Sequence, residues 1–168
     1  MGAPMGPSPS QSRQHAASIA LEGARAARTR PEDARKAIDA ALALAPDDVD
    51  VRMAAYKFHF YNHDSAPAAD HAAVCIRMFA ADLGLPPDWR SVAPDHADFA
   101  ALARAPGRYL QALIAWGYCR ARLGAVEEGR EAVAQAARLD PSDRFGARRL
   151  LAVIERGGVE IDAYAVDN

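Results

Sequence analysis

The stretch from Leu110 to Asp143 constrains the fold more than any other part of the chain. Its first half carries residues at three- and four-residue spacing, which places them on one face of a helix. These residues are Leu113, Trp116, Gly117 and Arg120. Gly124 follows where a helix should end, because glycine tolerates the left-handed conformation found there. A second amphipathic segment ends before Pro141, since the residue preceding a proline is disfavoured in a helix. The stretch therefore predicts a helical hairpin.

Small residues recur on the facing sides of this predicted hairpin. Gly117 lies in the first helix and Gly129 in the second. Because neither carries a side chain, we expect the two helix axes to approach closely at these positions. Trp116 is expected to be a core anchor that fills the space beside them.

The hairpin resembles a tetratricopeptide repeat, a 34-residue unit built from two antiparallel helices. When Leu110 is taken as the first residue, four residues match the family pattern, although Arg120 stands where the family usually has a tyrosine. The four matching residues are Trp116, Gly117, Gly124 and Pro141.

A second copy of the pattern lies 95 residues earlier and gives a first unit of about 15–48. Under that shift Glu32 matches Glu127, Ala37 matches Ala132, Leu44 matches Leu139 and Pro46 matches Pro141. Half of the residues are hydrophobic, and the abundant alanine favours helices. We therefore predict an all-α fold, a tetratricopeptide-like array of about three helical hairpins with a capping helix over 144–156. Asp48 and Asp143 are expected to cap the third helix and this last one.

The predicted domain covers 14–156. Residues 1–13 are rich in Pro, Gly and Ser and are expected to be a disordered lead, and 157–168 a flexible acidic and aromatic tail. Residues 85–107 break the repeat and are expected to be an insertion packed on the array through Trp89 and Phe99, with a short helix over 95–104. A functional lid is the alternative.

Charge and cysteine content exclude several classes of protein. The net charge is −2, so no bulk attraction to nucleic acid or anionic lipid is expected. The arginines between Arg138 and Arg156 are interspersed with acids. No apolar run is long enough to span a membrane. Two cysteines without a CxxC motif indicate a reducing cytoplasm.

Candidate chemical groups are few. His59 and His63 have the i, i+4 spacing that can hold a metal, and His71 and Cys75 share it, but the register turns most of them away from a common centre. Cys119 lies beside Arg120, which could lower the thiol pKa, although a packed side chain is favoured. No catalytic motif or cofactor signature occurs. We therefore expect neither an enzyme nor a bound metal or cofactor.

The resemblance implies a concave groove, lined by the first helix of each unit, that binds a protein or peptide segment. Its positions fall on Met53, Lys57, Phe60, Tyr61, Gln111, Ile114, Tyr118 and Arg122, with Phe145 and Arg148 on the capping helix. The expected function is an interaction scaffold. A tail of matching composition suggests occupation of the groove in its own or a neighbouring molecule. A self-associating structural protein is one alternative, and a metal-handling or accessory assembly protein is another.

A fainter resemblance concerns the segments YKFHFY and DPSDRFGARRLL. They are similar to small repeat proteins that accompany bacterial nitrogen-fixation genes. The resemblance implies an accessory role in that process.

Overall fold

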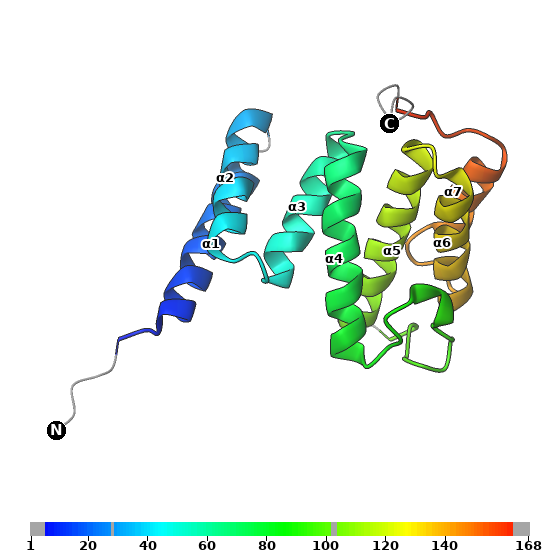
Figure 1. The fold of residues 1–168 in the computed structure, drawn as a ribbon, viewed down its shortest axis with the longest axis horizontal. Coiled ribbons are helices and arrows are strands. Elements are labelled where there is room, and N and C mark those ends of the chain that lie inside the picture. The colour runs from blue at the N-terminus through cyan, green and yellow to red at the C-terminus, as the bar shows by residue number, and fades with distance from the viewer. Residues whose placement is uncertain (1–5, 28, 102–103, 163–168) are drawn as a thin grey trace. The chain divides into compact units, whose positions relative to one another are not determined.

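The computed structural model describes residues 6–27, 29–101 and 104–162, and it confirms the all-α class (Figure 1). These residues form seven α-helices and one short 3-10 helix, with no strand among them. The chain divides into two compact units, 1–55 and 56–168, whose boundary falls within α3. The helices are α1 (Pro9–Ala26), α2 (Pro31–Leu44), α3 (Val49–Tyr61), α4 (Ser65–Leu83), η1 (Trp89–Ser91), α5 (Arg104–Arg122), α6 (Val126–Leu139) and α7 (Ala147–Glu155).

The first unit is a hairpin of α1 and α2 followed by the first turns of α3. Its core joins small and medium side chains of all three helices, namely Ala17, Leu21, Ala41 and Val51. Asp48 caps α3 as predicted, because its Oδ1 accepts hydrogen bonds from the backbone N–H groups of Asp50 at 2.9 Å and Val51 at 3.1 Å.

Helix α1 begins at Pro9, so the prediction of a disordered lead over 1–13 is wrong for 9–13. The reason is a capping box at Ser8 and Gln11. Ser8 Oγ accepts from the Gln11 N–H at 3.3 Å, and Gln11 Oε1 accepts from the Ser8 N–H at 2.8 Å. Pro9 also suits the first helical position. Residues 1–5 lie outside the described part of the chain.

In the second unit, α4, α5, α6 and α7 pack as successive neighbours, and Figure 1 shows them in that order. The predicted turn glycine Gly124 is confirmed by its φ of 91°, and Gly84, which ends α4, has a φ of 64°. Trp116 is only partly buried and packs against a cluster shared by α4 and α5 (Ala68, Ala69 and Cys119). Trp116 is therefore not fully buried, as a core anchor would be.

Helices α5 and α6 meet backbone to backbone at Gly117 and Gly129, as predicted. A Cβ atom added to Gly129 would lie 2.3 Å from the Gly117 carbonyl oxygen and 2.7 Å from the backbone nitrogen of Ala121. A Cβ added to Gly117 would lie 2.9 Å from the Gly129 oxygen. Only glycine fits at either position, so these two residues set the spacing of the hairpin.

The two predicted repeats correspond closely in helix bounds. When residue numbers are shifted by 95, the first residue of α1, Pro9, corresponds to the first residue of α5, Arg104. With the same shift, α2 and α6 begin and end at corresponding residues, and each has 14 residues. The first helix of each hairpin thus begins earlier than predicted, by a similar length.

The insertion packs on α6, and both expected anchors, Trp89 and Phe99, are buried. The Nε2 of buried Gln135 donates to the carbonyl oxygens of Trp89 at 2.9 Å and Val92 at 2.7 Å. The guanidinium of Arg144 donates to two further carbonyls of the insertion. These hydrogen bonds pair backbone carbonyl groups of an irregular segment, which lacks the regular backbone hydrogen bonds of a helix or sheet.

Two details of this region differ from expectation. Residues 95–101 form turns rather than the predicted short helix, and α5 begins at Arg104, so the insertion is shorter than 85–107. Asp143 is not the N-cap residue of α7, because that helix begins at Ala147 after Gly146, which has a φ of 71°. Asp143 instead has a φ of 52° and accepts a hydrogen bond from the Arg148 N–H at 3.1 Å. Asp143 is therefore not the N-cap residue, but its side chain still pairs a backbone N–H in the first turn of α7.

Candidate functional site

The second unit contains an open groove of about 320 Å³ between the last turns of α3, the middle of α5 and the turn that precedes α7. Aromatic side chains dominate the groove. It is lined by Tyr56, Lys57, Phe60, Tyr61, Gln111, Ile114, Ala115 and Phe145. Helical spacing explains the set, because residues three or four apart share a helix face.

Six of the predicted groove residues line it, namely Lys57, Phe60, Tyr61, Gln111, Ile114 and Phe145. Tyr118 and Arg122 continue the same face of α5 toward its C-terminal end. The ring of Tyr118 packs against that of Phe60 with centroids 5.6 Å apart, and the Arg122 guanidinium hydrogen-bonds the Tyr118 side chain. These two residues border the groove without lining it.

The remaining two predicted residues lie elsewhere. Met53 belongs to the first unit and is buried there, so it is not a groove residue. Helix α3 is apolar on most faces, and its pattern alone could not show which residues are covered. Arg148 is exposed on α7 but does not line the groove, because α7 starts three residues later than predicted.

The groove includes two residues that were not predicted, Tyr56 and Ala115, and one predicted residue, Phe145, that lies on a different element than expected. Tyr56 and Ala115 lie one helical turn from predicted residues, so their spacing was the available signal. Phe145 was expected on the capping helix but extends from the turn before it. It fits because Gly107 lies opposite, where an added Cβ would lie 3.2 Å from the Phe145 ring.

The polar character of the groove comes mainly from Lys57 and Gln111. Lys57 is exposed, as is Tyr61, whose residue surface is 76% accessible. Burial raises the pKa of the Tyr56 hydroxyl well above its usual value, so this group stays neutral. An exposed aromatic ring beside a cation, over an apolar floor, can bind an aromatic or aliphatic side chain together with an acidic group.

Of the predicted metal-binding candidates, His59 and His71 lie side by side, but the set is not arranged to hold a metal ion. His59 is buried, and its Nδ1 lies 3.3 Å from the Asp64 carboxylate, while its ring stacks on that of His71 at 5.8 Å. His63 is exposed at the end of the helix with a φ of 61°. Throughout the described ranges, no three His, Cys, Asp or Glu residues are arranged to hold a metal ion.

Cys119 is a buried packing residue and belongs to the cluster shared by α4 and α5. Burial raises its thiol pKa to about 12, although the charge of Arg122 opposes the shift. The proximity of Arg120 in sequence therefore does not produce an activated thiolate. Arg120 instead forms an ion pair with Glu128 at 2.7 Å.

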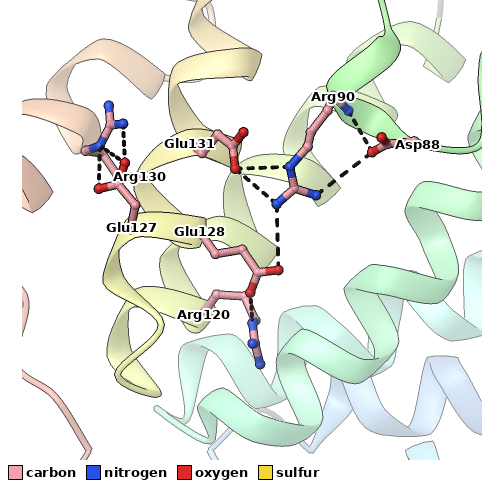
Figure 2. A network of polar contacts seen from close by, with 7 residues as sticks. All are labelled: Asp88, Arg90, Arg120, Glu127, Glu128, Arg130 and Glu131. Carbon is pink, nitrogen blue, oxygen red and sulfur yellow. Dashed lines mark hydrogen bonds and ion pairs between the residues drawn. The ribbon is translucent and has the colours of Figure 1, made fainter.

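A charged network covers the junction of the insertion with α5 and α6 (Figure 2). Arg90 lies within 3.0 Å of Glu131 and 3.9 Å of both Asp88 and Glu128. Its guanidinium also lies 4.2 Å from the centre of the Trp89 ring. The hydrogen bond to Glu131 raises the pKa of Arg90. Because every cation here has an acidic partner, we interpret the network as an anchor for the insertion.

The described residues form an all-helical protein, and its second unit carries an open groove rich in aromatic side chains. The chain is 34% identical over 123 residues to an uncharacterized 19.8 kDa protein in the nifW 5' region of Azotobacter chroococcum mcd 1, an alignment that covers 72% of this chain and 69% of that protein. The chain belongs to the family of that protein. No family model and no solved structure matches the chain, and the tetratricopeptide resemblance stays a prediction.

In the part of the chain that the structure describes, every helix is too short or too polar to cross a membrane.

Proposed function

We propose that this protein is a non-enzymatic interaction scaffold that binds a peptide or protein segment in the groove between α3 and α5. The observation that carries the proposal is the exposed ring of Tyr61 beside Lys57, over the floor formed by Phe60 and Ile114. Large exposed aromatic side chains on a rigid helix are typical of binding surfaces. The buried, protonated Cys119 further favours binding over catalysis.

The size of the groove suits a short segment. Its volume of about 320 Å³ lies at the lower end of ligand pockets and accommodates a few side chains. A contact of this size gives affinities on the order of micromolar, or about −8 kcal/mol. We expect a partner segment with an aromatic or aliphatic anchor and at least one acid that faces Lys57.

The relative's location gives a place to look for the partner. That protein is described by its position in a nifW 5' region. We therefore propose that this chain acts with proteins of bacterial nitrogen fixation, as an accessory or assembly protein. The search for partners should begin with proteins made under nitrogen-fixing conditions.

The test uses two variants of the full chain. Lys57→Ala combined with Tyr61→Ala removes the exposed groove surface, and both residues are exposed, so helicity should be preserved. Arg77→Ala, on the exposed face of α4, is the matched control. Affinity capture identifies a partner, and its dissociation constant is then measured by calorimetry for each variant. We expect the groove variant to weaken binding by roughly tenfold or more and the control to leave it unchanged. Equal affinity of both variants would show that the groove is not the binding site.

A further inference from the structure

The chain returns to the end of α5 after α7 ends. Gly157, with a φ of 70°, reverses its direction. The Asp162 carboxylate then accepts hydrogen bonds from Nε of Arg122 at 3.0 Å and from its Nη2, and the Asp162 backbone N–H donates to the Arg122 carbonyl at 2.7 Å. Only 16% of the Arg122 side chain and 20% of the Asp162 side chain are exposed. The last carbonyls of a helix lack intrahelical donors, so this contact caps α5 and pairs its terminal arginine.

This anchor lies on the face of α5 that carries the groove. Arg122, Tyr118 and Ile114 are spaced four residues apart and share that face. Tyr118 connects the two features, because it contacts Arg122 on one side and the groove residue Phe60 on the other. With a rise of about 1.5 Å per residue, Ile114 lies roughly 12 Å along the helix from Arg122.

Six residues, 163–168, follow the anchor and lie outside the described part of the chain. Their sequence is Ala-Tyr-Ala-Val-Asp-Asn. Fully extended, six residues span at most about 20 Å, which exceeds the distance from Arg122 to the floor of the groove. Tyr164 and Val166 match its aromatic and aliphatic lining, and Asp167 is complementary in charge to Lys57.

We propose that residues 163–168 lie in the groove of their own chain, held at its edge by the bond between Asp162 and Arg122. This inference rests on the proposed function, because it concerns the regulation of the same groove. A partner segment must displace the tail before it binds. The tail therefore lowers the apparent affinity for every partner and favours those that also supply a carboxylate to Arg122.

The test is disulfide trapping in the full chain. Tyr61→Cys combined with Val166→Cys places one thiol on the groove and one in the tail, and mild oxidation joins them if they meet. The native cysteines, Cys75 and Cys119, are buried and do not interfere. The control pair uses Asp70→Cys, on an exposed face of α4 away from the groove, with the same tail residue.

We expect the groove pair to give roughly tenfold more intramolecular disulfide than the control pair, because tethering raises the effective concentration at one site. Adding Asp162→Ala should lower that yield toward the control value while circular dichroism stays unchanged. Equal yields from the two pairs would overturn the inference. Disulfide-linked dimers as the main product would also overturn it, because they assign the groove to the tail of a second copy.

The two proposals fail in different ways. If the intramolecular disulfide forms but the variant combining Lys57→Ala with Tyr61→Ala binds the partner normally, the proposed function fails and tail docking stands. If the groove variant loses the partner but no disulfide forms, only the tail inference fails. If both hold, Asp162→Ala should tighten partner binding severalfold, because it releases the competitor.

Discussion

Replacing Gly129 by alanine tests whether backbone contact sets the spacing of the α5–α6 hairpin. The new Cβ would lie 2.3 Å from the Gly117 oxygen and 2.7 Å from the Ala121 nitrogen. Backbone atoms cannot rotate away as side chains can, so the two helices must separate. Overpacking costs about 1–3 kcal/mol and occasionally more, and this contact belongs at the upper end of that range.

Helix propensity acts in the opposite direction. Alanine is favoured over glycine inside a helix by about 1 kcal/mol. The net destabilisation of Gly129→Ala should therefore be about 2 kcal/mol, which lowers the Tm of a unit of this size by roughly 8 °C. Gly23→Ala is the matched control, because its Cβ would meet only Ala37 at 3.9 Å. That change should stabilise the first unit by about 0.4–1 kcal/mol.

The assay can separate the two units. Trp89 and Trp116 are the two tryptophans of the chain, and both lie in the second unit. Urea unfolding followed by tryptophan fluorescence therefore reports on the unit that carries Gly129, while far-ultraviolet circular dichroism follows the whole chain. If Gly129→Ala unfolds at the same urea concentration as wild type or a higher one, the backbone contact does not limit the hairpin.

Three further outcomes are expected. Asp48→Ala should destabilise the first unit by about 1 kcal/mol through loss of the α3 cap, whereas Asp47→Ala should have little effect in the same denaturation experiment. Burial alone would raise the pKa of Asp140, but hydrogen bonds from Ser142 and the Arg144 N–H lower it. Its contribution to stability is thus complete above the ordinary carboxyl pKa of about 4 and lost as the pH falls through the lower folded value. Acid titration should accordingly show a smaller loss for Asp140→Asn. Because burial raises the pKa of Cys119 to about 12, a thiol reagent at pH 8 should label it only after denaturant is added.

The placement of glycine and proline made the α5–α6 hairpin predictable from the sequence. Gly117 and Gly129 on facing helices indicated a close approach, and Gly124 and Pro141 marked the ends. These signals are local and steric, so they hold whatever surrounds them. The starts of α1 and α5 were less predictable. The capping box at Ser8 is brief, and residues before Arg104 carry no strong cap in the sequence.

The residues of the groove were partly predictable from helical spacing in the sequence. Helical spacing identified the face of α5, and six expected residues line the groove. Spacing cannot show which part of a mostly apolar helix is covered, so Met53 was wrongly included. Phe145 depends on a turn that places it opposite Gly107, a tertiary contact that no periodicity reveals.

The glycine contact between α5 and α6 also determines how a displacement travels through the second unit. Where side chains separate two helices, a change of rotamer can absorb a small shift of one against the other. At Gly117 and Gly129 the two backbones are in direct contact, with no side chain between them that could change its rotamer. A displacement of α5 should therefore move α6 as well. Gln135 on α6 holds the backbone of the Trp89 loop, and that loop moves with it. A ligand that binds in the groove and displaces α5 should therefore change the fluorescence emission of Trp89, which it does not contact.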